Sequence, residues 1–287
     1  MNYIIILLIL LILIIIYYLL IHTSTDYFKN NIYPEYYVDN LPILRKKLKS
    51  LNINIPIYNK YETVLIEFRE IPHIEFVLIN TIIKLPTWAH TIICGLDNYN
   101  SIKKMCKMIS PNIRIIILKL NNIDIYMYNK LLFSLYLWNL FTSQKVLIYQ
   151  EDSIIFKSNI NDFIEYDYIG APWVEMTNYS YPGGNGGFSL RTVDTMKAVI
   201  NNYPVFDNNR TIYDILNDKT ITIPGNEDVY YYNTIMNNSM GKLANLDVSK
   251  SFSIEFIYYD DSFGAHCYFY TMSESEWKNK IEKLILS

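Results

Sequence analysis

The chain has 287 residues, a formal net charge of −3 at pH 7 and an apolar content of 51%. This weakly acidic balance argues against a general nucleic-acid-binding surface, which needs an excess of Lys and Arg, so we expect no nucleic-acid partner. The three cysteines form no CxxC pair, which argues against a structural zinc site and leaves room for one disulfide at most.

The run from Tyr3 to Ile21 contains no charged residue, glycine or proline. A helix needs about 20 apolar residues to cross a bilayer core, and no small-residue cleavage site of a signal peptide follows Ile21. We therefore expect residues 1–21 to form a retained transmembrane anchor, with the lipid bilayer as a partner through residues 3–21. The flanking charges do not decide the orientation of this single-pass protein.

Residues 22–60 show no sustained periodicity, and we interpret them as a stem with a helix around residues 41–51. From Thr63 onward, short apolar runs alternate with longer helical patterns. The expected strands are 63–68, 90–95, 113–118 and 145–149, and the expected helices are 73–84, 101–109, 128–141, 192–201 and 228–236. This alternation predicts an α/β domain over residues 61–287, with a parallel sheet covered on both faces.

Ligands of such sheets bind beyond the carboxyl ends of the strands. Glu67 and Arg69 follow the first expected strand, and the triplet Gln150-Glu151-Asp152 follows the fourth. A carboxylate in this triplet can hold Mg²⁺ or Mn²⁺ against a diphosphate, because both ions favour oxygen ligands. The alternative is a strand that ends in a polar turn, and the triplet alone favours that alternative.

Two later segments combine glycines with an aromatic ring or a polar amide. Trp173 ends the run Ile-Gly-Ala-Pro-Trp, and its flat face can stack on a sugar ring or pack in a core behind the proline turn. Four glycines surround Asn185 between residues 183 and 187, where they let the backbone approach a ligand or form a plain turn. Both alternatives stay open for both segments.

Two titratable motifs complete the candidate site. Glu227-Asp228 stands at the start of an expected helix, where these carboxylates can act as a general base or stabilise the first turn of the helix. His266, in the run Phe-Gly-Ala-His, is a candidate metal ligand, although a lone histidine is more often structural.

The order of these motifs resembles the GT-A class of glycosyltransferases. The segments IEFRE, LIYQEDSIIF, FIEYDYIGAPW, GNGGFSLR, NEDVYY and FGAH are similar to a family of glycosyltransferase-like domains, largely of unknown function, found in microbes and giant viruses. The resemblance covers residues 63–266 and implies a GT-A-like, Rossmann-type mixed sheet flanked by helices and preceded by the transmembrane helix. It implies inverting transfer of a sugar from a nucleotide sugar to a hydroxyl of a glycan or glycoprotein acceptor.

The resemblance also implies roles for particular residues on the donor side. Asp152 and His266 would bind Mn²⁺ or Mg²⁺, although Gln150 stands where the first acid of the family's DxD motif is usual. Glu67 and Arg69, together with Gln150 and Asp152, would bind the nucleotide part of the donor. The missing acid keeps an alternative open, in which the chain is a catalytically inactive, membrane-tethered nucleotide- or glycan-binding module.

On the acceptor side, the resemblance implies that Asp228, or in second place Glu227, takes the proton from the attacking hydroxyl. The residues expected to line the acceptor and donor-sugar pocket are Trp173, Asn185, Gly186 and Gly187.

The expected location of the protein is a membrane of the host secretory pathway or of a virion.

Overall fold

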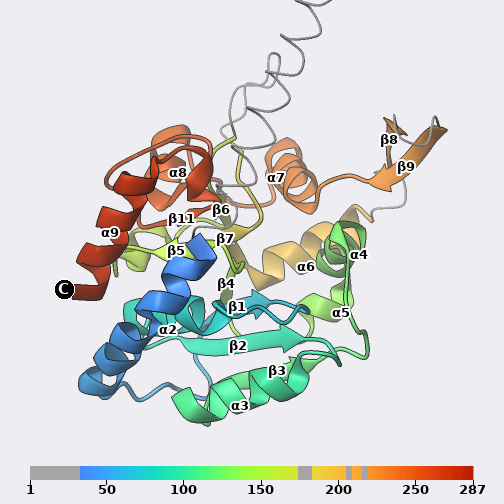
Figure 1. Cartoon of the computed structure of the whole chain (residues 1–287). Coiled ribbons are helices and arrows are strands. Elements are labelled where there is room, and N and C mark those ends of the chain that lie inside the picture. Colours follow the sequence, from blue (N-terminus) through green and yellow to red (C-terminus); the bar gives the residue numbers. More distant parts are fainter. Residues whose placement is uncertain (1–32, 174–182, 205–208, 215–218, 287) are drawn as a thin grey trace, which may run out of the picture.

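The computed structural model describes residues 33–173, 183–204, 209–214 and 219–286 (Figure 1). The predicted membrane anchor at residues 1–21 lies outside these ranges. Within them, no helix combines the length and the apolar character that crossing a bilayer requires.

A six-stranded sheet of order β3-β2-β1-β4-β7-β6 forms the centre of the molecule. The first four strands pair in parallel, whereas β7 pairs antiparallel with both β4 and β6. The predicted α/β class and the mixed, mainly parallel sheet are therefore confirmed. The strands are β1 (Tyr61–Ile66), β2 (Ala89–Cys94), β3 (Arg114–Ile117), β4 (Lys145–Tyr149), β6 (Tyr168–Gly170) and β7 (Phe188–Thr192).

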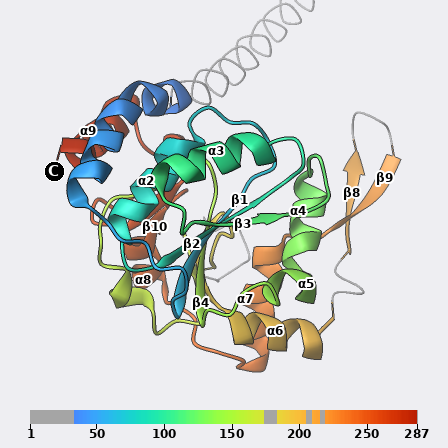
Figure 2. The ribbon, with the colours of Figure 1, turned by 90° about the horizontal axis from the view of Figure 1, so that it is seen from below.

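Helices cover both faces of this sheet, as the view in Figure 2 shows. Successive strand residues point to opposite faces, so Leu65 and Leu147 join one buried cluster while Val64 and Val146 join the other. The first face carries α2 (Ile74–Lys84) and α3 (Tyr99–Ile109), and the second carries α4 (Ile125–Leu132), α5 (Leu135–Trp138), α6 (Val193–Asn202) and α7 (Glu227–Asn238).

The helix expected over residues 128–141 is broken into α4 and α5. The break occurs because the Ser134 hydroxyl accepts a hydrogen bond from the Leu137 N–H and starts a new helix, as serine commonly does at an N-cap. β7, which was not among the expected strands, begins directly after the glycine-rich segment. All three cysteines lie within the described residues and are free thiols, so the disulfide that the sequence allowed is not formed.

Part of the predicted stem is packed into the domain. Residues 33–51 form a helix in which Tyr37 and Leu44 are fully buried. The Tyr37 ring stacks on Phe76 of α2, with ring centroids 4.2 Å apart, and Arg45 forms an ion pair with Glu75. The burial of apolar side chains explains why this segment is not a free spacer.

A second, three-stranded sheet of order β10-β11-β5 connects the end of β4 to the C-terminal part of the chain. β5 and β11 pair antiparallel, with Ser153 opposite His266. This pairing places His266 beside the turn that joins β4 to β5. The strands are β10 (Ser253–Ile254), β11 (Gly264–His266) and β5 (Ser153–Ile155).

The remaining elements surround these two sheets. A hairpin projects from the body between α6 and α7 in Figure 1. The hairpin strands are β8 (Asn209–Asp214) and β9 (Lys219–Pro224), the remaining helices are α8 (Leu246–Phe252) and α9 (Glu274–Leu286), and the short 3₁₀ helices are η1 (Ile160–Phe163) and η2 (Tyr268–Tyr270).

Candidate functional site

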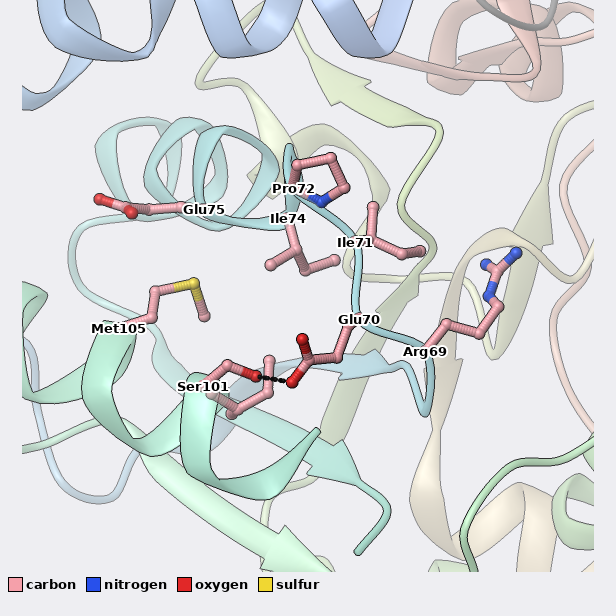
Figure 3. Close-up of a pocket in the computed structure, with 9 residues that line it drawn as sticks. Arg69, Glu70, Ile71, Pro72, Ile74, Glu75, Ser101 and Met105 are labelled. Carbon is pink, nitrogen blue, oxygen red and sulfur yellow. Dashed lines mark hydrogen bonds between the residues drawn. The ribbon is translucent and has the colours of Figure 1, made fainter. Parts of the chain in front are cut away.

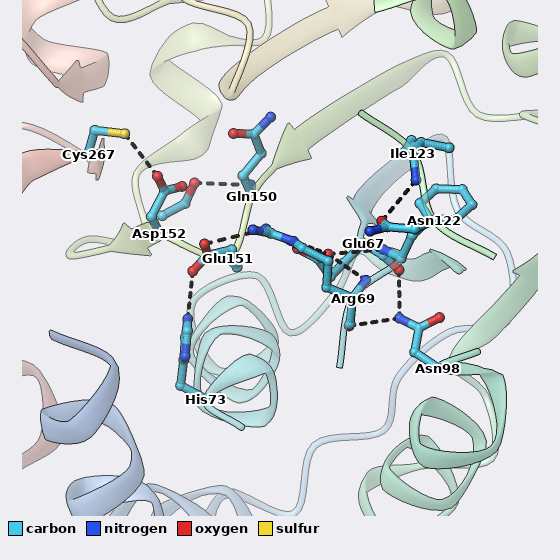
Figure 4. A network of polar contacts seen from close by, with 12 residues as sticks. Glu67, Arg69, His73, Asn98, Asn122, Ile123, Gln150, Glu151, Asp152 and Cys267 are labelled. Atoms are coloured by element: carbon cyan, nitrogen blue, oxygen red, sulfur yellow. Dashed lines mark hydrogen bonds and ion pairs between the residues drawn. The ribbon is translucent and has the colours of Figure 1, made fainter. Parts of the chain in front are cut away.

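Asp152, His266 and Cys267 form a compact group beyond the carboxyl end of β4. Figure 4 shows Asp152 and Cys267 of this group. Asp152 Oδ1 lies 3.3 Å from His266 Nε2, and the Cys267 thiol donates a hydrogen bond of 2.8 Å to Asp152 Oδ2. One potential ligand atom from each residue lies within 4.8 Å of the others. The pairing of β5 with β11 thus brings Asp152 and His266 together, as the resemblance implied.

This group is chemically suited to a divalent cation. Carboxylate and imidazole are common ligands of divalent metals, and Asp152 Oδ1 is buried with no hydrogen-bond partner in the described part of the chain. Burial alone would raise the pKa of Asp152, but the adjacent His266 imidazole and the hydrogen bonds around the carboxylate hold that pKa at about 2. Asp152 is therefore ionised at neutral pH, as a metal ligand must be.

Gln150 lies in the same group. Its Oε1 atom is 3.1 Å from His266 Nε2, so the amide contacts the histidine that the resemblance placed at the metal site. An amide oxygen can orient the imidazole, but it adds no negative charge to the group. The charge expected from the first acid of a DxD motif is therefore missing at this position.

Glu151 anchors the acidic turn. Its Oε2 atom accepts a hydrogen bond of 2.7 Å from the Tyr33 hydroxyl and lies 2.6 Å from His73 Nε2. Arg69 Nη2 is 3.5 Å from the other carboxylate oxygen. These partners come from the helix at residues 33–51 and from the segment before α2, far away in sequence, so no local signal could have revealed them.

Glu67 and Arg69 form a rigid unit after β1. Glu67 Oε1 accepts hydrogen bonds from the backbone N–H groups of Phe68 and Arg69, and both carboxylate oxygens accept bonds from the Arg69 guanidinium. The Asn98 amide donates to the carbonyl oxygens of both residues (Figure 4). The Glu67 carboxylate is thus occupied, whereas the Arg69 side chain remains 56% exposed and can meet an anionic ligand.

A pocket of about 310 Å³ adjoins Arg69 between the N-terminal ends of α2 and α3 (Figure 3). Glu70, Ile74, Ser101 and Met105 are among its lining residues, but Asp152 and His266 are not. It therefore lies beside the polar network of Figure 4 without including the candidate metal ligands.

The segment Asn185–Gly187 joins two halves of the site. The Gly187 N–H donates to Asn185 Oδ1 at 2.7 Å, and the Gly186 N–H donates to Asp228 Oδ2 at 3.2 Å. A Cβ atom at Gly187 would overlap the His266 ring, and one at Gly186 would overlap the Glu227 carboxylate. Glycines are therefore required here because the backbone passes directly between the metal-ligand group and the acidic pair.

Glu227 is held in a buried ion pair. Its two carboxylate oxygens accept bonds of 2.5 and 2.8 Å from the Arg191 guanidinium, and its backbone N–H donates to Asn129 Oδ1. Arg191 is fully buried and lies against the rings of Tyr168 and Tyr231. A carboxylate clamped in this way is poorly placed to accept a proton from a substrate, which favours Asp228 for that role.

Asp228 is only partly buried and faces the Gly186 N–H. Burial, and in second place the charge of Glu227, raises its pKa to about 7. A carboxylate whose pKa lies near the working pH can both accept and release a proton, which is the property required of a general base.

Trp173 packs against protein atoms. Its ring meets the Tyr232 ring edge to face, with centroids 5.6 Å apart, and it lies over Gly183, where a side chain would overlap it. The Trp173 side chain is partly exposed, so the expected contact of its ring with a sugar stays a prediction.

A family model described as "Protein of unknown function (DUF5672)" matches residues 112–266, more than half of the 287 residues. The chain belongs to this family. The matched segment contains Asp152, the Asn185–Gly187 segment and Asp228, and it ends at His266. No curated protein sequence is similar enough to count as a relative.

Several solved structures are distantly similar to this chain. A mannosyltransferase from Pyrobaculum calidifontis, solved in complex with GDP-Man and Mn²⁺, is 9% identical with a TM-score of 0.37 over 56% of this chain and 55% of its own. TarS 1-349 from S. aureus is 10% identical, with a TM-score of 0.41 over 79% and 64% of the two chains. The inositol-1-phosphate CTP transferase from T. maritima is 9% identical, with a TM-score of 0.44 over 78% and 94%.

The chain thus spans less than two thirds of the length of the first two of these proteins. These likenesses concern the fold alone, and no function is inferred from them.

Proposed function

We propose that the chain is a glycosyltransferase, which moves a sugar from a nucleotide-sugar donor to a hydroxyl of a glycan or glycoprotein acceptor. The observation that carries this proposal is the position of Asn185–Gly187, which places the Asp152–His266 group and Asp228 on either side of one backbone segment. An electrophilic site for a diphosphate and a base for a hydroxyl are the two parts that sugar transfer requires.

Asp152 and His266 are the residues that would hold Mn²⁺ or Mg²⁺, and the chemistry supplied by the bound ion is neutralisation of charge on the diphosphate leaving group. Arg69 extends the same polar network, and its exposed guanidinium provides a further positive charge for the nucleotide. Glu67 orients this guanidinium through two hydrogen bonds and so acts on the donor through Arg69.

Asp228 takes the proton of the acceptor hydroxyl as its oxygen attacks the anomeric carbon from the side opposite the diphosphate. The new bond joins the acceptor oxygen to this carbon, and the electron pair of the broken bond leaves with the diphosphate. The product therefore has the inverted configuration. A pKa of about 7 lets Asp228 perform this step near neutral pH and return the proton to solvent.

The proposed setting is a membrane of the host secretory pathway or of a virion. Residues 1–21 would anchor the chain, because this run is long enough and apolar enough to cross a bilayer. The helix at residues 33–51 packs on the domain through the buried Tyr37 ring.

The direct test is donor hydrolysis and transfer by the full-length chain in mild detergent. A panel of nucleotide sugars is supplied with Mn²⁺, and the released nucleoside diphosphate is measured for the wild type and for Asp152→Asn. We expect release with one or a few donors and its loss in the variant and with chelator. Release that is unchanged by both treatments would contradict the role of this group.

Gln150 favours a second candidate, a nucleotide- or glycan-binding module without catalysis, because it removes a charge that a metal site usually has. Calorimetry separates the two candidates. A binding module binds a nucleoside diphosphate but forms no product with any donor of the panel. The proposed enzyme binds the nucleoside diphosphate and also forms product.

A further inference from the structure

Cys267 contacts the same carboxylate as its neighbour His266. Consecutive residues of an extended strand point to opposite faces, yet the side chains of both residues reach Asp152. The left-handed backbone of Cys267, with φ of 47°, makes this possible by ending β11 at His266. Such a conformation is uncommon for a residue other than glycine, so the chain adopts a costly local geometry that turns the thiol towards Asp152.

The other ring nitrogen of His266, Nδ1, also lies near a carboxylate. His266 Nδ1 is 3.5 Å from the carboxylate of Glu255, whose side chain is 5% exposed. Metal-bound histidines usually present their second ring nitrogen to a carboxylate, which orients the ring and raises its basicity. Glu255 occupies this position, while Nε2, which lies 3.1 Å from Gln150 Oε1, also faces Asp152 and Cys267.

The same carboxylate is anchored from another direction. The Asn185 amide donates a hydrogen bond of 3.0 Å to Glu255 Oε1, while Glu255 Oε2 is buried without a hydrogen-bond partner among the described residues. The group therefore has an oriented imidazole, a carboxylate and a thiol, all of which face one point.

From this geometry we propose that Cys267 is a third protein ligand and that the site takes a borderline divalent transition metal, such as Zn²⁺, in preference to Mg²⁺. Thiolate ligands select for such metals, whereas Mg²⁺ keeps to oxygen ligands. Binding breaks the S–H bond, forms a sulfur–metal bond and releases the proton to solvent. Three protein ligands leave coordination positions open, as in catalytic zinc sites.

The inference rests on the proposed function only for the use of those open positions, which would receive the donor diphosphate. The ligation itself is independent of turnover. Exchange of Mn²⁺ or Mg²⁺ for a softer ion also changes which inhibitors act on the site, since thiol-reactive reagents would then compete with the metal.

Co²⁺ is a suitable probe because a cysteine thiolate gives it a near-ultraviolet charge-transfer band in addition to its visible bands. Co²⁺ is titrated into the full-length chain in mild detergent, and the same titration is made with Cys267→Ser and with the double variant Cys94→Ala/Cys106→Ala. We expect the charge-transfer band in the wild type and in the double variant, which keeps only Cys267. We expect its loss in Cys267→Ser, and no displacement of Co²⁺ by a large excess of Mg²⁺.

Visible Co²⁺ bands without the charge-transfer band, a band that survives Cys267→Ser, or no Co²⁺ binding would each overturn the proposal. If Cys267→Ser does not fold, the wild type still decides the matter. Bound Zn²⁺ must then slow alkylation of Cys267 by iodoacetamide, measured by mass spectrometry, and equal rates with and without Zn²⁺ would overturn it. A thiolate band in a chain that transfers no sugar would contradict the proposed function and leave the ligation standing.

Discussion

The chain contains two Glu-Asp pairs, Glu151-Asp152 after β4 and Glu227-Asp228 at the start of α7. The two pairs are arranged alike in the folded chain. In each pair the glutamate is tied to the protein, Glu151 through Tyr33 and His73 and Glu227 through Arg191. In each pair the aspartate faces the candidate site. The glutamates thus fix the position of the backbone, and the aspartates are left for chemistry.

The two aspartates differ in the direction of their pKa shift. Burial opposes ionisation of both, but Asp152 lies beside His266 and its pKa is held at about 2, whereas Asp228 lies beside the charge of Glu227 and its pKa is raised to about 7. When the surroundings of two acids shift their pKa values in opposite directions, one acid stays charged and can serve as a ligand, while the other can accept a proton. Variants of both pairs test this separation of roles.

Replacing Asp228 by Asn removes the proposed base. We expect transfer to fall by about 10²- to 10⁴-fold, and the wild-type rate to rise with pH through about 7 as Asp228 loses its proton. The folded pKa lies above the ordinary value of 3.8, so the stability that protonated Asp228 contributes is present at acid pH and is lost as the pH rises from about 4 through 7.

Rate profiles and urea unfolding at pH 5 and pH 8 check both expectations. Asp228→Asn should weaken the pH dependence of unfolding and leave the folded chain at least as stable at pH 8. A variant that retains the wild-type rate and profile would exclude Asp228 as the base.

Glu227→Gln tests whether the other member of this pair is an anchor. The substitution leaves Arg191 buried and without its counter-charge, and we expect a loss of about 3–5 kcal/mol in the free energy of unfolding. Lys278→Ala, which breaks an exposed ion pair with Glu274 within α9, is the control and should have little effect. If Glu227→Gln unfolds like the wild type but abolishes transfer, Glu227 belongs to the chemistry instead.

Gly187→Ala tests the backbone segment between the two pairs. Its methyl group would overlap the His266 ring, so we expect a loss of about 1–3 kcal/mol in stability and weaker metal binding by calorimetry. Gly241→Ala is the matched control, because the three atoms nearest to its added methyl group all belong to the Asp167 side chain and not to a candidate site residue. Equal metal affinity in both variants would mean that Gly187 does not set the position of His266.

Tyr33→Phe should have the smallest effect. It removes the hydrogen bond to Glu151, and we expect a loss of about 1 kcal/mol because His73 still contacts the carboxylate. Tyr36→Phe is the control, since its hydroxyl makes only a 3.3 Å bond to the exposed Glu282. If both variants unfold alike, the helix at residues 33–51 does not support the acidic turn through this bond.

The part of the fold from β1 to β4, in which strands alternate with helices, could be predicted because its sequence signals are local. Apolar runs such as residues 145–149 match β4, and Pro86 and Pro111 mark helix ends close to those of α2 and α3. The antiparallel β7 could not be predicted in the same way, because it follows a glycine-rich segment and its partners β4 and β6 are chosen by sheet pairing. The packing of residues 33–51 on the domain could not be predicted either, because Tyr37 meets Phe76 of α2 only in the folded chain.

The candidate site likewise contains some residues that local sequence signals indicate and others that they do not. Asp152, Asp228 and His266 can be named as candidates from the sequence because their residue types and order suggest chemistry. The roles of Glu151 and Arg191 depend on contacts that span tens of residues in sequence, and no pattern near either residue indicates its partner. Cys267 had a weak signal in its position next to His266, but a lone thiol without CxxC spacing did not distinguish a ligand from a buried side chain.

The central claim is that the two aspartates have different tasks, and one paired measurement tests it most directly. Binding of a nucleoside diphosphate with Mn²⁺ or Zn²⁺ is measured by calorimetry for the wild type, Asp152→Asn and Asp228→Asn, and sugar transfer is measured on the same samples. We predict that both variants lose transfer, while only Asp152→Asn loses metal-dependent binding. Loss of binding in both variants, or intact binding in Asp152→Asn, would contradict the division between a metal ligand and a base.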